Sequence, residues 1–76
     1  FEPLTALVAA NAGLADLDHI VTTSRKHLLP GGWLLVEHGW TQGEAVRALF
    51  TQAGYAAVET CRDYGGNERL TLGQWL

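Results

Sequence analysis

The chain has 76 residues, of which 47% are hydrophobic and 17% are charged, and only five are Lys or Arg, so its formal net charge is −3. This composition is typical of a small globular domain and excludes both a disordered tail and the basic surface of a nucleic-acid-binding protein. No apolar run approaches the roughly 20 residues of a membrane span, and no secretory signal is present. We therefore expect a cytoplasmic protein with no nucleic-acid or membrane partner.

Residues that bind metals or form disulfides are sparse. The single cysteine, Cys61, cannot form an internal disulfide, and the three histidines lie too far apart in sequence to share a ligand turn. We therefore predict no metal site and expect Cys61 to behave as a small buried apolar residue. The sequence contains no Met and opens on Phe1-Glu2-Pro3, so we expect that a preceding segment is missing.

The first half of the chain predicts two helices. A short one follows Pro3, which suits a first helical turn, because Leu4, Leu7 and Val8 recur at helical spacing before residues 11–13 stop the run. The second covers about residues 16–28 and has one apolar stripe, formed by Leu17, Ile20, Val21 and Leu28. Basic residues at 25–27 lie at the negative end of its dipole.

Residues 33–36 form a continuous apolar run of strand length, which is typical of a central strand in a parallel sheet with both faces covered. Thr41 and Glu44 then match a capping box, which predicts the start of a helix. Gly54 is a suitable left-handed stop for that helix. Its buried face is predicted from i, i+3, i+4, i+7 spacing to comprise Val46, Leu49, Phe50 and Ala53.

The last third predicts an antiparallel hairpin, with strands at 57–62 and 69–76 joined by a polar turn. In the second strand Leu70 and Leu72 point to one face, and Arg69 and Thr71 point to the other. Charges of both signs flank the turn and predict cross-strand ion pairs. The resulting class is α/β, with one central parallel strand, flanking helices and a closing antiparallel hairpin. Such a strand needs more neighbours than 76 residues supply, so residues 1–76 are expected to be one portion of a single larger domain.

Ligands of open α/β sheets bind beyond the carboxyl ends of the strands. Here that position holds Glu37 and His38, which could bind a polar substrate or move a proton. The alternative is that Glu37 pairs locally and His38 is an ordinary loop histidine. All three tryptophans, Trp33, Trp40 and Trp75, are expected to be core or packing anchors, and Trp40, at the strand end, could also line a pocket. The residues alone predict no catalytic constellation.

Three longer stretches resemble one enzyme family. They are Glu37-His38-Gly39-Trp40, Gln42-Gly43-Glu44-Ala45-Val46-Arg47 and Thr60-Cys61-Arg62-Asp63-Tyr64-Gly65-Gly66-Asn67-Glu68-Arg69. Phe1-Glu2-Pro3 with Ala6-Leu7 resembles the segment that trails the catalytic strand of HemK-type glutamine methyltransferases. Leu29-Pro30-Gly31-Gly32-Trp33 resembles a turn of class I S-adenosylmethionine-dependent methyltransferases in general. Together these stretches resemble the C-terminal part of the bacterial release-factor glutamine methyltransferases, over essentially the whole chain.

The resemblance implies a Rossmann-like class I methyltransferase sheet, of which this chain would supply the fifth, sixth and seventh strands. It also implies transfer of a methyl group from S-adenosylmethionine to the glutamine amide in the Gly-Gly-Gln loop of class 1 peptide chain release factors. The family's catalytic Asn-Pro-Pro-Tyr motif, its glycine-rich cofactor loop and its ribose-binding acid are absent from this sequence. No catalytic or cofactor-binding residue is therefore assigned, and the isolated chain is expected to be inactive.

Four residues would lie near the substrate cleft in supporting roles, namely Glu2, Pro3, Glu37 and His38. Two alternatives remain open. One is a piece of a ribosomal-protein glutamine methyltransferase, although the stretch 37–40 favours the release-factor enzyme. The other is a non-enzymatic α/β binding or oligomerisation module. In every case an incomplete sheet would expose apolar surface and unpaired backbone, so we expect the chain to self-associate or to be only marginally folded.

Overall fold

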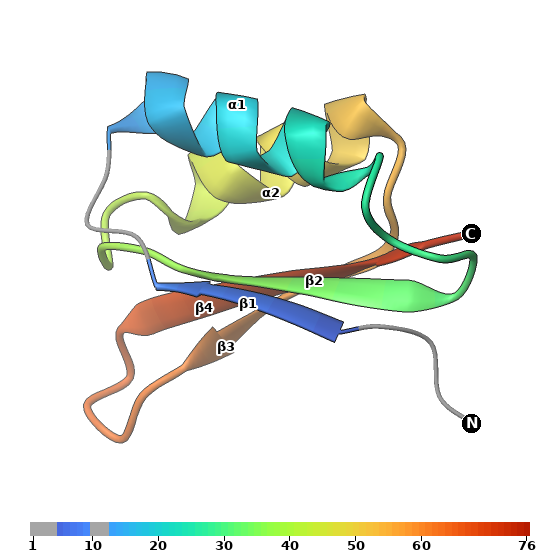
Figure 1. The fold of residues 1–76 in the computed structure, drawn as a ribbon. Helices are drawn as coiled ribbons and strands as arrows, with labels where there is room; N and C mark the ends of the chain where they lie inside the picture. Colours follow the sequence, from blue (N-terminus) through green and yellow to red (C-terminus); the bar gives the residue numbers. More distant parts are fainter. Residues whose placement is uncertain (1–4, 10–12) are drawn as a thin grey trace.

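The computed structural model describes residues 5–9 and 13–76. Within these residues the elements are β1 (Thr5–Ala9), α1 (Leu14–Ser24), β2 (Gly32–Glu37), α2 (Gly43–Ala53), β3 (Ala56–Arg62) and β4 (Glu68–Trp75). The strands form one mixed sheet in the order β1-β2-β4-β3, and both helices lie on the same face of it (Figure 1). The predicted α/β class and the closing hairpin are confirmed.

The central position of β2 follows from its pairing on both edges. It runs parallel to β1, with Ala6 opposite Leu34, and antiparallel to β4, with Gly73 opposite Leu34. The predicted central strand at 33–36 is therefore confirmed. The partner on its second edge comes from the end of the chain, because β4 inserts between β2 and β3 (Figure 1).

The first predicted helix is wrong over the described residues, because Thr5–Ala9 forms β1. Residues 6–9 are all apolar, so their pattern fits a strand as well as a helix, and pairing with β2 decides between them. Ala6 and Val8 pack against the core, whereas Leu7 points away from it and is 62% exposed. The described residues thus form four strands, where the resemblance implied three. Pro3, Leu4 and residues 11 and 12 of the predicted stop lie outside the described residues, whereas Gly13 is the N-cap of α1.

The core lies between the sheet and the two helices. Its fully buried apolar residues come from three elements, α1, α2 and β2, and are Leu17, Val21, Val46, Phe50, Leu34 and Val36. They include Leu17 and Val21 from the apolar stripe predicted at 16–28, and Val46 and Phe50 from the buried face predicted for the helix that ends at Gly54. Leu49 and Ala53 pack against the same cluster. The predicted buried faces of both helices are therefore confirmed, since amphipathic spacing reports which side of a helix meets the sheet.

Arg25, one residue after α1, connects the C-terminal ends of the two helices. Its Nε donates to the carbonyl of Thr22 at 2.9 Å, and one Nη donates to the carbonyl of Ala53, at the end of α2, at 3.1 Å. A cation at this point bonds carbonyls that a helix leaves free and opposes the negative ends of both dipoles. The helix is shorter than predicted, ending at Ser24 rather than at residue 28, but the predicted place of Arg25 at its negative end is confirmed.

A close approach at Gly73 seats α2 on the sheet. A Cβ atom on this residue would lie 2.6 Å from Cδ2 of Phe50 and 3.0 Å from Cβ of Tyr55. Tyr55 packs between Phe50 and Trp75, at ring-centroid distances of 5.1 and 5.5 Å, and donates its hydroxyl to the carbonyl of Val21 at 2.9 Å. Burial raises the pKa of the Tyr55 phenol, and the nearby Arg25 partly opposes this. The absence of a side chain at Gly73 therefore sets the spacing between α2 and β4.

Replacing Gly73 with Ala should lower the free energy of unfolding by about 1–3 kcal/mol, because Phe50 and the backbone at Tyr55 would both have to move. Urea unfolding followed by circular dichroism measures the change. Gly13→Ser is the matched control, since nothing lies within 4 Å of a Cβ there and Ser is favoured at a helix N-cap. Equal midpoints for the two variants would contradict the close approach.

The second face of the sheet carries no helix among the described residues (Figure 1). We call this the open face. Its apolar side chains are exposed or half-buried, and strand alternation assigns to it Leu7, Trp33, Leu35, Leu70 and Leu72. The expectation that β2 is covered on both faces is not met by the described residues, because α1 and α2 pack against each other on the same side of the sheet.

Cys61 also lies on the open face, where it pairs with Leu70, and it is exposed. The expectation that it is buried is wrong, because β3 is an edge strand and Cys61 points away from the helices. Neither of the helices described in the structure is long and apolar enough to cross a membrane.

Self-association should proceed through the open face. Because Leu35 and Leu72 lie opposite each other at its centre, replacing both with Thr should shift the chain toward monomer in sedimentation velocity. Leu29→Thr is the control, since Leu29 is 51% exposed but lies outside this face. A stable monomer of the unchanged chain would contradict the prediction.

Candidate functional site at the carboxyl end of the central strand

The two candidate residues at the end of β2 point to opposite sides of the sheet. His38 is buried, with 5% of its surface exposed, and its amide donates to the carbonyl of Arg69 at 2.9 Å, which continues the β2–β4 ladder. Glu37 is exposed on the open face, opposite Leu70. Strand alternation therefore separates the imidazole from the carboxylate, although they are neighbours in sequence. Glu2 and Pro3, the other predicted supporting residues, lie outside the described residues.

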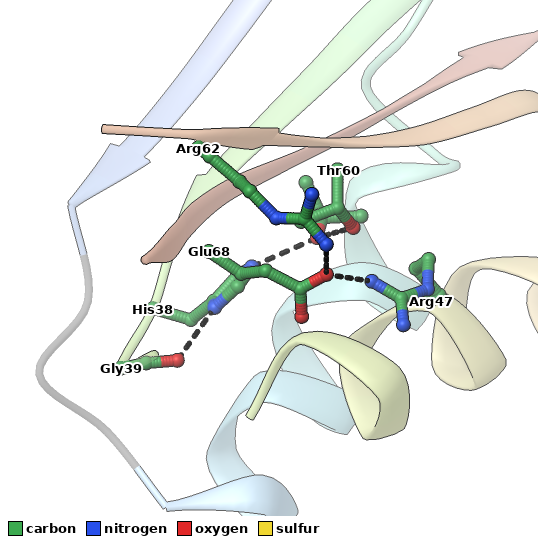
Figure 2. Close-up of polar contacts among 7 residues, drawn as sticks. His38, Gly39, Arg47, Thr60, Arg62 and Glu68 are labelled. Carbon is green, nitrogen blue, oxygen red and sulfur yellow. Dashed lines mark hydrogen bonds and ion pairs between the residues drawn. The ribbon is translucent and has the colours of Figure 1, made fainter. Parts of the chain in front are cut away.

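Both ring nitrogens of His38 lie at hydrogen-bond distance from oxygen atoms (Figure 2). Nδ1 is 2.9 Å from the carbonyl oxygen of Gly39, and Nε2 is 2.8 Å from the hydroxyl oxygen of Thr71. The Thr71 hydroxyl is in turn 2.8 Å from that of Thr60. Thr71 is completely buried. These side chains link the end of β2 to the two strands of the hairpin through one polar network beneath the helices.

A closed turn follows His38 and leads into α2. The amide of Gly39 donates to Oε1 of Gln42 at 2.8 Å, and the amide of Gln42 donates to the carbonyl of Gly39 at 3.0 Å. Between these residues Trp40 is 60% exposed, so the expectation that it is a core or packing anchor is wrong, because the turn carries it away from the core. We call residues 39–42 the Gly39–Gln42 turn. It is held at both ends and presents an indole at the carboxyl end of the sheet.

The predicted capping box at Thr41 and Glu44 is wrong. The helix begins at Gly43, its N-cap is Gln42, and no side chain caps it there. In a capping box, a Glu or Gln side chain accepts from the backbone amide three residues earlier. Here Gln42 makes that bond, with the amide of Gly39. The bonded pair is therefore Gly39 and Gln42, two residues earlier than the predicted pair, Thr41 and Glu44.

The first residue of α2 meets a carboxylate from the hairpin. A Cβ on Gly43 would collide with the carboxylate of Glu68, so the missing side chain makes room for it. Glu68 Oε2 also lies 3.0 Å from Nη1 of Arg47 on α2 and 3.7 Å from Nη2 of Arg62 on β3 (Figure 2). The contact between Arg62 and Glu68 confirms the prediction of cross-strand ion pairs at the hairpin turn. The contact with Arg47 joins the hairpin to the helix, and a carboxylate is favourable at a helix N-terminus.

The hairpin turn that precedes Glu68 is organised by Asp63. Its Oδ1 accepts the amides of Gly65 and Asn67 at 2.9 and 3.0 Å, and its Oδ2 accepts from Nε of Arg69 at 3.1 Å. These bonds, above all that from the Asn67 amide, hold the pKa of Asp63 below its usual value. The carboxylate thus fixes the turn from which Glu68 reaches α2.

The contribution of Asp63 to stability should be complete above its unfolded pKa, about 3.9, and should be lost as the pH falls through its lower folded pKa. A carbon-13 titration of the Asp63 carboxyl group measures that folded value. The Asp63→Asn variant keeps an oxygen acceptor for the two amides but loses the charge, so its unfolding midpoint should depend less on pH in this range. An ordinary pKa for Asp63 would contradict the prediction.

The described residues offer no centre for a metal or for a nucleotide-like cofactor. No group of three or more His, Cys, Asp or Glu side chains could hold a metal ion within this part of the chain. The N-terminus of α2, where an anionic group could otherwise bind, is taken by the carboxylate of Glu68. These described residues do not fit S-adenosylmethionine.

Comparison with known proteins gives extensive similarity to one class of enzyme. The chain is 67% identical over 75 residues to the release factor glutamine methyltransferase of Escherichia coli (strain K12), which is 99% of this chain and 27% of that protein. The corresponding enzymes of Salmonella typhimurium and Pseudomonas aeruginosa are 64% and 59% identical over the same share of the chain. The chain is homologous to part of the release factor glutamine methyltransferases. No protein-family model matches it.

The chain spans about a quarter of the length of these relatives. Homology to release factor glutamine methyltransferases agrees with the resemblance found in the sequence, and the α/β fold is consistent with the C-terminal part of a class I methyltransferase. Sequence reasoning missed Thr60, Thr71 and Gln42 as partners at this site. The one usable signal was the alternation in β4, where the side that carries Thr71 proves to be the side beneath the helices.

Proposed function

We propose that this chain is the C-terminal part of an enzyme that methylates the glutamine amide of the Gly-Gly-Gln motif in class 1 peptide chain release factors. The observation that carries the proposal is 67% identity over 99% of the chain to an enzyme named for release factor glutamine methylation. The methyl donor is S-adenosylmethionine, bound by residues outside this chain, and the site of action is the cytoplasm, where translation terminates.

The reaction forms a bond between the methyl carbon and the amide nitrogen of glutamine, breaks the carbon–sulfur bond of the donor and releases one proton from that nitrogen. An amide nitrogen is a weak nucleophile, so most of the catalytic advantage must come from orientation and from preorganised oxygen acceptors. We assign no residue of this chain to those acceptors. Its contribution is to hold the wall of the cleft rigid.

The carboxyl end of β2 is the part of this chain that we assign to the cleft, because ligands of open α/β sheets bind there. His38 supports the wall from beneath, and Glu37 lies on the opposite face at the same strand end. Glu2 and Pro3 are assigned the same supporting role from the sequence resemblance alone. The isolated chain is proposed to be inactive and to bind neither cofactor nor release factor.

An exchange enzyme tests the proposal. In it, this chain replaces the matching 75 residues of the E. coli release factor glutamine methyltransferase. We expect it to methylate a class 1 release factor with kcat/KM within about tenfold of the unmodified enzyme, because cores that keep volume and pattern tolerate many substitutions. Incorporation of labelled methyl groups into the release factor, with mass spectrometry of the modified glutamine, measures this.

Two controls decide between the alternatives. A ribosomal protein that carries a methylatable glutamine, used as the second substrate, should react at least a hundredfold more slowly; the reverse preference would favour the ribosomal-protein enzyme. Calorimetric titration with S-adenosylmethionine should give heat with the exchange enzyme and none with the 76-residue chain. A folded exchange enzyme that binds no cofactor, or that methylates neither substrate, would sink the proposal and leave a non-enzymatic module.

A further inference from the structure

His38 is a buried titratable residue, and the proposed function assigns it no part in a proton transfer. It is 5% exposed, and both of its ring nitrogens are engaged within the protein. A general acid or base must reach the substrate through a free nitrogen, directly or through one water molecule. The geometry therefore points to a different use of this imidazole.

The direction of each hydrogen bond follows from the partners. A carbonyl oxygen only accepts, so Nδ1 of His38 carries the hydrogen that it donates to Gly39. In the uncharged ring Nε2 must then accept from the hydroxyl of Thr71, whose oxygen accepts from the hydroxyl of Thr60. The donated hydrogens thus run from β3 through β4 to the end of β2 (Figure 2). The chain of bonds ends on a backbone carbonyl and not at an open position.

That carbonyl also closes the turn above it. The oxygen of Gly39 receives two donors, Nδ1 of His38 at 2.9 Å and the amide of Gln42 at 3.0 Å. The amide of Gly39 is bonded to the Gln42 side chain at 2.8 Å. His38 therefore fastens the Gly39–Gln42 turn to the buried Thr71, while Trp40 within the turn stays 60% exposed.

We infer that His38 is a positioning residue: through the Gly39 carbonyl it fixes the Gly39–Gln42 turn, so that Trp40 is held as a contact surface for the protein substrate. It neither binds the substrate nor carries a proton in the reaction. The inference rests on the proposed function, which supplies the substrate. A large exposed aromatic on a rigid support suits a protein partner, because little side-chain entropy is lost when it binds.

Two substitutions in the exchange enzyme separate the two nitrogens of His38. The amide nitrogen of Asn can occupy the place of Nδ1, so His38→Asn keeps a donor for Gly39. His38→Gln can reach Thr71, as Nε2 does, but leaves the carbonyl without that donor. We expect His38→Gln to raise KM for the release factor about fivefold to tenfold, with kcat within about threefold, and His38→Asn to raise KM clearly less.

The controls test whether the effect passes through the turn. His27→Gln makes the same change at an exposed histidine far from the site in sequence and should leave both constants unchanged. Thr71→Val should raise KM, and Thr71→Ser should restore it, because Ser keeps the hydroxyl. In a Trp40→Ala background, His38→Gln should add less than about twofold, since coupled residues are not additive.

Several outcomes would overturn the inference in an active exchange enzyme. One is a loss of kcat above about a hundredfold in both His38 variants together with a missing limb in the pH–rate profile, which would make His38 a proton carrier. Another is a lower melting temperature with KM unchanged, which would make its role merely structural. Nitrogen-15 NMR that places the hydrogen on Nε2 of the uncharged ring would overturn it even without kinetics. An unsubstituted exchange enzyme that methylates nothing would instead overturn the proposed function.

Discussion

The antiparallel pairing of β4 with β2 is the interaction on which the rest of the structure depends. It joins residues 32–37 to residues 70–75, so the end of the chain becomes the second neighbour of the central strand. The register then places Gly73 beneath Phe50 and Thr71 beside His38, and the ladder continues through the His38 amide. A shift of one residue would turn the side chains of β4 to the other face and remove all of these contacts.

The carboxyl end of β2 and the turn after it are held by three side-chain contacts. β4 supplies Thr71 beneath His38, the Gln42 side chain closes the following turn, and the hairpin sends Glu68 to the start of α2. The contacts of Thr71 and Glu68 join residues far apart in the sequence, and the second has room only because Gly43 carries no side chain. The result is a preorganised strand end at the place where α/β sheets bind ligands.

The two faces of the sheet differ because the helices lie on only one of them. The helix-facing side is closed by a continuous apolar core, whereas the open face presents Leu7, Trp33, Leu35, Leu70 and Leu72. This asymmetry agrees with the share of the relatives that the chain spans, about a quarter. An apolar sheet face of this kind is expected to be covered by further protein.

The sequence by itself determined the local features: the central strand at 33–36, the buried faces of both helices, the stop at Gly54, the hairpin and its ion pairs. Each depends on spacing within one element or on neighbouring residues, which periodicity and turn chemistry report. Only the tertiary structure decided that Thr5–Ala9 is a strand, because its apolar residues fit either period until β2 pairs with them. Likewise, alternation separated the side chains of β4 into two sets but could not say which faced the helices. The long-range register buried Thr71 beside His38, turned Glu37 away and left Cys61 exposed, because burial depends on which strands become neighbours.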